Sequence, residues 1–186
     1  AYLHSNAALC LVMGDELWFY YTGFAGDPAR KGDPSPAKNG MYANASMGIA
    51  TLRRDGFASM DAGAEGGELT TRPLALGRRP CLCVNADAKG GELRAELLDA
   101  QGRAIEGFGA AACEPMASDA TRHRLTWKGG RTLEALGEAP VRIRFHLKRG
   151  KLYAFWTSDE SGASSGYLAG GGPGYDSLRD GGGAAR

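Results

Sequence analysis

The 186-residue chain lacks three features that would point to a particular partner or compartment. Its 22 Lys and Arg residues nearly balance 21 Asp and Glu residues, and the formal net charge is +1. No global field therefore attracts nucleic acid or an anionic membrane. No run approaches the roughly 20 apolar residues that span a bilayer. We expect no nucleic-acid partner and no membrane partner.

A signal-peptide pattern is not visible either, because no basic segment followed by an apolar one opens the sequence. The first residue is Ala1 rather than Met, and the opening residues Ala-Tyr-Leu-His already have the character of the approach to a strand. We therefore expect a truncated chain. On that interpretation the missing signal leaves the localisation unknown.

Cysteine is scarce, with four residues at Cys10, Cys81, Cys83 and Cys113. They are too few and too unevenly spaced for a disulfide framework. On a strand, Cys81 and Cys83 would point to the same face, where a bond between them is sterically awkward. A four-thiolate metal site remains an alternative, but no Cys-x-x-Cys spacing supports it. Buried free thiols are favoured, and we expect no metal and no cofactor.

Catalytic patterns are lacking too. No Gly-x-Ser-x-Gly elbow occurs, and the glycine-rich end has no Lys-Ser/Thr ending of a phosphate loop. The adjacent Asp15 and Glu16 point apart, whereas glycoside hydrolysis needs two facing carboxyl groups. Turn hydrogen bonds are the favoured role of Asp55 and Asp61. Asp159 and Glu160 lie at the edge of the tail, and we expect them to be exposed to solvent. His123 and His146 are too far apart in the sequence to suggest a metal site. Both lie among outward arginines, so an exposed sheet face is favoured for them.

What the sequence does contain is strands. The apolar run 8–13 breaks at Gly14-Asp15 and is followed by 17–21, Leu-Trp-Phe-Tyr-Tyr, so the pattern predicts strand, turn and strand. Because 17–21 is apolar on both sides, we expect a central strand covered on both faces. The segment 23–44 is rich in Gly, Pro and Asn and predicts a long loop, for which disorder is favoured over a binding role.

The stretch from Gly48 to Asp61 marks a change of architecture. Beyond it the chain has short alternating runs with turns between them and almost no helix, a pattern typical of an antiparallel β-sandwich. Strands are predicted at 69–76, 80–86, 92–97, 122–128, 141–148 and 151–157, with one helical turn at 133–137. The last two strands should pair as a hairpin through Arg149-Gly150. The predicted organisation is a first unit at 1–54, a sandwich at 55–158 and a flexible Gly/Ala/Ser-rich tail at 159–186.

Two groups of framework motifs resemble a known family. The run Gly14 to Gly23 (GDELWFYYTG) and the run Gly48 to Phe57 (GIATLRRDGF) look like the last blade of a five-bladed β-propeller glycoside hydrolase of the invertase, levanase and arabinanase superfamily. The segments Val84–Asp87, Gly91–Asp99, Thr121–His123, Trp127–Gly129 and Val141–Leu147 look like the β-sandwich that follows the propeller in these proteins. The resemblance covers about residues 9–156.

The resemblance implies an all-β chain with a partial propeller blade before a β-sandwich. In the family the catalytic carboxylates lie on earlier blades, so no catalytic residue is carried over and the chain is expected to be a non-catalytic fragment. Its expected partner is the missing N-terminal propeller domain, which it would stabilise.

The alternative is a self-standing carbohydrate-binding sandwich with an oligo- or polysaccharide partner. Flat aromatic side chains stack on the C–H patches of sugar rings. The candidates are Trp18, Tyr20, Tyr21, Trp127, Tyr153 and Trp156. Each lies inside an apolar strand, so a role in the core or at the interface between the two parts is favoured over sugar binding.

Overall fold

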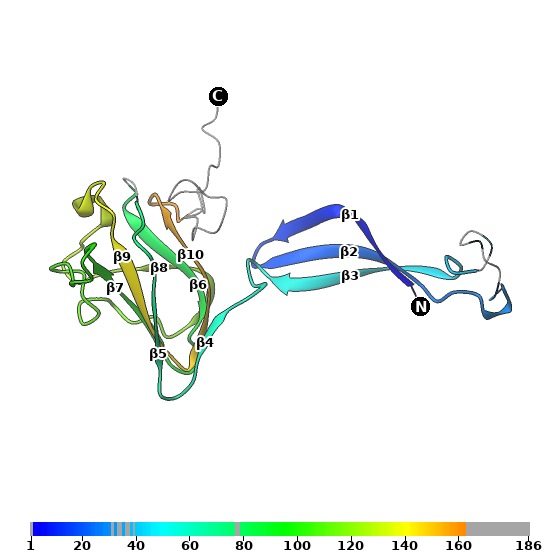
Figure 1. The fold of residues 1–186 in the computed structure, drawn as a ribbon, viewed down its shortest axis with the longest axis horizontal. Helices are drawn as coiled ribbons and strands as arrows, with labels where there is room; N and C mark the ends of the chain where they lie inside the picture. The colour runs from blue at the N-terminus through cyan, green and yellow to red at the C-terminus, as the bar shows by residue number, and fades with distance from the viewer. Residues whose placement is uncertain are drawn as a thin grey trace, which may run out of the picture. The chain divides into compact units, whose positions relative to one another are not determined.

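The computed structural model describes residues 2–30, 32, 35, 38, 40–76 and 79–162 (Figure 1). It confirms the prediction of an all-β, antiparallel chain. The chain divides into two compact units, Ala1–Phe57 and Ala58–Arg186. The tail predicted to be flexible lies, from residue 163 on, outside the described residues. Among those that are described, no helix has the length and apolar character to cross a membrane.

The first unit is a three-stranded sheet, here called sheet A. It has the order β1 (Tyr2–Met13), β2 (Glu16–Phe24) and β3 (Ala45–Arg53). Gly14 and Asp15 form the two-residue turn between β1 and β2, and Gly14 has the positive φ of 63° that such tight turns require. The predicted central position of β2 is confirmed. The expectation that both of its faces are covered is not met, since Leu17 is its one buried residue.

The connection from β2 to β3 contains the 3-10 turn η1 (Pro28–Arg30). Its base continues the hairpin through backbone hydrogen bonds from Ala25 to the Asn44 carbonyl, 3.2 Å, and from Gly26 to the Ala43 carbonyl, 3.1 Å. The Asn44 side-chain amide also donates to the Gly26 carbonyl. These bonds order the base of a loop for which the composition favoured disorder.

The second unit is a β-sandwich of two sheets. Sheet B has the order β4 (Met60–Ala62), β10 (Gly150–Ser158), β6 (Cys81–Asp87) and β8 (Asp119–Leu125). Sheet C has the order β5 (Gly67–Thr70), β9 (Arg142–Lys148) and β7 (Glu92–Leu98). The inward residues of the two sheets meet in one apolar core with fully buried members such as Leu82, Leu97, Ile143 and Phe145. The predicted alternation of β9 is confirmed, with Ile143, Phe145 and Leu147 buried.

The predicted hairpin between β9 and β10 is wrong. β9 pairs with β5 and β7, whereas β10 pairs with β4 and β6. Only Arg149 separates the two strands, and a hairpin needs a loop of at least two residues. Arg149 has a φ of 46°, and the chain turns there from sheet C into sheet B. The links from β4 to β5 and from β6 to β7 likewise change sheet.

One other segment departs from the predicted strands. Between 69 and 76 the strand β5 ends at Thr70, and Leu74 makes an isolated bridge to Val141, because the intervening Pro73 has no N–H to donate. A turn at Asp99–Gly102 follows β7, with the Gly102 N–H donating to the Asp99 carbonyl at 3.0 Å. The predicted helical turn is the 3-10 turn η2 (Leu133–Leu136), ended by Gly137.

Candidate functional site

The six aromatic candidates fall into three environments. Trp127 is 3% exposed; its indole N–H donates to the Ala95 carbonyl at 3.2 Å, and its ring meets Phe108 edge to face with a centroid distance of 5.3 Å. Trp156 is also buried, with its indole N–H donating to the Gly162 carbonyl at 3.3 Å. Tyr153 is half-buried at the register shift of β10. The two tryptophans of the sandwich therefore present no ring face on which a sugar could stack.

The aromatic candidates of sheet A are half-buried. Trp18 and Tyr20 lie two residues apart on β2 and so share one face of the sheet. The Trp18 indole N–H donates to the Glu16 carboxylate at 2.8 Å. Tyr21 lies on the other face, over Gly48, where an added Cβ would come within 2.5 Å of the tyrosine ring. The structure thus brings Trp18 and Tyr20 together and separates Tyr21 from them.

Asp15 and Asp159 lie in turns, whereas Asp61, which was predicted in a turn, lies on strand β4. Asp15 follows Gly14 in the hairpin turn, and its carbonyl accepts from the Arg54 N–H at 2.8 Å. Asp61 lies 3.7 Å from the Lys151 ammonium and accepts from the Ser59 hydroxyl. The Asp159 carboxylate accepts from the Ser161 N–H at 2.9 Å, and the hydrogen bonds from Ser161 lower its pKa. Asp61 and Asp87 both line a hollow of about 410 Å³, which the cations Lys89, Arg149 and Lys151 line as well.

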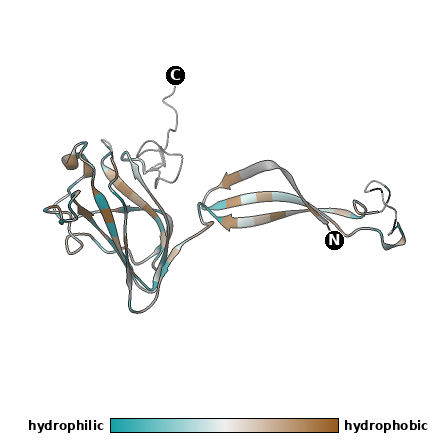
Figure 2. Ribbon diagram, viewed as in Figure 1, coloured by the Kyte–Doolittle hydropathy of each residue, from teal (hydrophilic) through white to brown (hydrophobic). Residues whose placement is uncertain are grey.

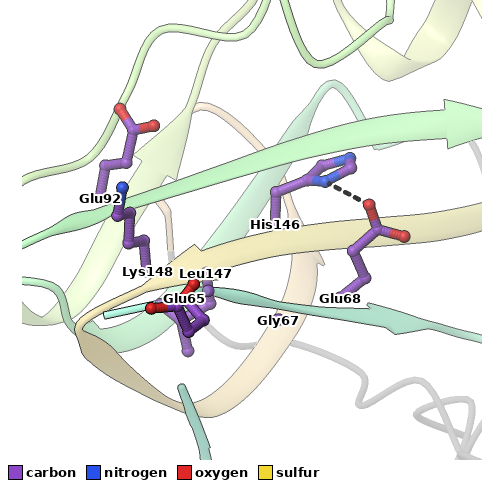
Figure 3. A pocket seen from close by; sticks show the side chains of 8 residues that line it. Glu65, Gly67, Glu68, Glu92, His146, Leu147 and Lys148 are labelled. Atoms are coloured by element: carbon purple, nitrogen blue, oxygen red, sulfur yellow. Dashed lines mark ion pairs between the residues drawn. The ribbon is translucent and has the colours of Figure 1, made fainter. Parts of the chain in front are cut away.

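Sequence reasoning missed a charged cluster on the outer face of sheet C, beside a hollow of about 320 Å³. His146 of β9 lies between two carboxylates, with Nδ1 at 3.2 Å from Glu68 of β5 and Nε2 at 3.1 Å from Glu96 of β7. Figure 3 shows the contact between His146 and Glu68 at this hollow. Glu96 also accepts from Arg144 at 3.1 Å. The cluster therefore joins all three strands of the sheet.

The chemistry of this cluster follows from its geometry. Glycoside hydrolysis needs space for a sugar between two carboxyl groups. The imidazole of His146 fills the space between Glu68 and Glu96, and so the arrangement stabilises strand pairing rather than admitting a substrate. The outward position of His146 was predicted from alternation, but its partners depend on strand order, which the sequence does not state.

His123 differs from the prediction. It was expected on a solvated face with its arginine neighbours, but Arg122 and Arg124 point to one side of β8 and His123 to the other. His123 pairs with the core residue Val84 on β6. Burial lowers the pKa of the His123 imidazole.

The sandwich contains three described thiols, of which two lie together outside the main core. Cys81, Cys83 and Cys113 are buried and free. Cys81 and Cys83 share the outer face of sheet B with Trp156, separate from the main core. Burial raises the pKa of Cys83 to about 11 and raises the pKa of Cys81 and Cys113. Among the residues the structure describes, no group of three or more His, Cys, Asp or Glu could hold a metal ion.

Comparison with known proteins yields no relative. No protein family, curated protein or solved structure matches the chain.

Proposed function

We propose that the chain is a non-catalytic part of a glycoside hydrolase-like protein of the invertase, levanase and arabinanase superfamily. Sheet A would be the last blade of a propeller, and the sandwich would be the domain that follows it. The physical role of the chain would be to cover and stabilise the propeller. The proposal rests on the resemblance of the framework motifs and on one structural observation, the uncovered apolar character of both faces of sheet A.

The two faces follow from the register of the strands. On one face Val12 lies opposite Leu17, and Leu17 lies opposite Leu52. On the other face Tyr20 lies opposite Ile49. Leu11, Met13, Met47 and Ile49 are exposed on the face of Tyr20, and Leu3 and Val12 are exposed on the face of Leu17. Figure 2 shows hydrophobic stretches on the strands of this sheet.

Exposure of these apolar side chains to water is energetically unfavourable. Full burial of one large aliphatic side chain contributes about 1.5–3 kcal/mol, and sheet A leaves at least five of them in water. An antiparallel sheet with one solvated face usually carries polar residues there. Sheet A has no polar face of that kind. A blade within a propeller has a neighbouring blade on each face, and this setting would cover both faces of sheet A.

The coding sequence upstream of Ala1 tests the proposal. Four further blades with acidic residues near their common axis would support it, and in that longer protein the amides of sheet A should exchange with solvent more slowly than in the chain alone. A start codon immediately before Ala1 would refute it. Hydrolysis of a fructan or an arabinan by the purified chain alone would also contradict the non-catalytic role.

A second function is favoured by one observation, the pair Trp18 and Tyr20 beside the Glu16 carboxylate. Aromatic faces next to a hydrogen-bonding carboxylate are the chemistry of a sugar subsite. If this pair binds oligosaccharide, fructan, arabinan or xylan fragments should quench tryptophan fluorescence in the native chain and in Trp127→Phe, but not in Trp18→Ala. Flat titrations with all three would refute carbohydrate binding and leave the structural role unaffected.

A further inference from the structure

The turn that follows β10 lies next to Cys83 on the outer face of sheet B. Gly162 donates to the Asp159 carbonyl at 3.1 Å and closes the turn. A Cβ added to Gly162 would lie 4.0 Å from the Cys83 sulfur and 3.6 Å from the Arg122 side chain. The backbone of the turn is therefore in position to shield Cys83.

The register of sheet B aligns the residues beneath this turn. Trp156 of β10 pairs with Cys83 of β6, and Cys83 pairs with Arg124 of β8. Cys81 lies two residues from Cys83 on the same face, opposite Ser158. An indole, two thiols and a guanidinium thus share one face of the sheet, and both thiols are buried.

Polar contacts hold the turn to sheet B in the described residues. The Trp156 indole donates to the Gly162 carbonyl at 3.3 Å. Arg124 donates to the two Glu160 carboxylate oxygens at 2.7 and 3.5 Å. The sequence Asp159-Glu160-Ser161-Gly162 contains no apolar side chain that could anchor it. Segments with few buried apolar contacts open at a small fraction of the global unfolding free energy.

We propose that Cys81 and Cys83 form a shielded thiol pair that opening of the 159–162 turn exposes to small disulfides. In the reaction a cysteine thiolate attacks one sulfur of the disulfide. A new S–S bond forms to the protein, the original S–S bond breaks, and its electron pair leaves on the second sulfur as a thiolate. The attacking cysteine has already released its proton to solvent, and the small disulfide is itself the oxidant, so the step needs no other one.

The charges around the thiols favour this gating. In the closed state burial raises the pKa of Cys81, and the Glu160 and Asp159 carboxylates of the turn raise it further, while Arg124 lowers it. When the turn opens, burial and both carboxylates are removed together. Arg124 remains on β8 beside the thiols and is no longer paired with Glu160. The open state is therefore both accessible and suited to a thiolate.

Cys113 provides an internal control. It is buried in the main core, where the Ala95 N–H lies 3.3 Å from its sulfur. The turn does not cover it. Reaction of Cys113 therefore reports global unfolding, whereas reaction of Cys81 and Cys83 alone reports local opening.

The test is the rate of reaction with the neutral disulfide 4,4′-dithiodipyridine in a Cys10→Ser background, with the modified cysteines located by mass spectrometry. Cys81 and Cys83 should react before Cys113. Glu160→Gln should accelerate them roughly threefold, as expected for loss of an exposed ion pair. Trp156→Phe, which removes the hydrogen bond to Gly162, should act in the same direction. The matched control Glu106→Gln, an exposed glutamate in the loop after β7, should leave the rate unchanged.

Two results would overturn the proposal. One is reaction of Cys81 and Cys83 in step with Cys113, which would place their exposure in global unfolding. The other is an unchanged rate in both Glu160→Gln and Trp156→Phe, with both variants folded by circular dichroism.

Discussion

The two units of the chain differ in how many of their apolar side chains are buried. In the described part of the first unit, Leu17 is the one buried hydrophobic side chain, whereas Met47 is 75% exposed and Phe57 72% exposed. All other buried hydrophobic residues of the described chain belong to the sandwich, where two sheets close over a common core. The first unit has strands without a core, and the second has both.

The difference shows what strand pairing alone can achieve. Sheet A has a continuous ladder of nine paired positions between β2 and β3, yet hydrogen bonds exchanged with water contribute only about 0.5–1.5 kcal/mol each. Burial of apolar surface supplies most of the stability of a domain. We therefore expect the sandwich to be the stable unit and sheet A to depend on a further covering layer.

The largest expected effect is a difference in amide protection. Under native conditions the amides of β2 should open with a free energy at least about 3 kcal/mol lower than those of β6 and β9, since sheet A has almost no buried apolar contact to lose. Hydrogen exchange followed by mass spectrometry on the intact chain measures both at once. Equal protection of the two units would contradict the view that sheet A lacks a core.

The same substitution in each unit sharpens the comparison. Phe145→Ala should lower the free energy of unfolding of the sandwich by about 3–5 kcal/mol, because a fully buried ring leaves a cavity. Phe57→Ala removes an exposed ring whose centroid lies 6.1 Å from that of Phe19, and it should cost less than about 1.5 kcal/mol. Urea unfolding of variants that keep only Trp127 or only Trp18 as the fluorophore reads the two units separately. Similar costs at both sites would remove the distinction.

A third prediction concerns the links at which the chain of the sandwich passes from one sheet to the other. A Cβ on Gly91 would collide with the Lys148 carbonyl oxygen, and a Cβ on Gly150 would lie 2.6 Å from the Asp87 carbonyl oxygen. Gly91→Ala should therefore destabilise the sandwich by about 1–3 kcal/mol.

The neighbouring Gly90 provides the matched control for this corner. A Cβ there meets nothing within 4 Å, and Gly90→Ala should change the stability by no more than about 1 kcal/mol. Thermal unfolding of the two variants side by side makes the comparison. A Gly91→Ala protein as stable as Gly90→Ala would show that the corners are not closely packed.

The sequence predicted strands better than it predicted their partners. Alternation identified β7 and β9 because apolar residues recur at every second position, at Leu93, Ala95 and Leu97 of β7 and at Ile143, Phe145 and Leu147 of β9. Pairing could not be inferred in the same way, because the one-residue link at Arg149 determines whether the chain forms a hairpin or changes sheet. The cluster of Glu68, Glu96 and His146 was missed for the same reason, since its members come from three strands that become neighbours only after the sheets form.

The smallest expected effect concerns His123, which the sequence placed on the wrong face. Burial lowers its pKa below the ordinary value of 6.5, so the folded state favours the neutral imidazole. The unfolded chain therefore binds a proton more readily, and the stabilising contribution is present above about pH 6.5 and is lost as the pH falls through the folded-state pKa. The sandwich should lose stability between pH 7.5 and pH 5, and His123→Gln should reduce this dependence. Urea midpoints at both pH values measure the effect, and an unchanged pH dependence in the variant would place His123 in solvent after all.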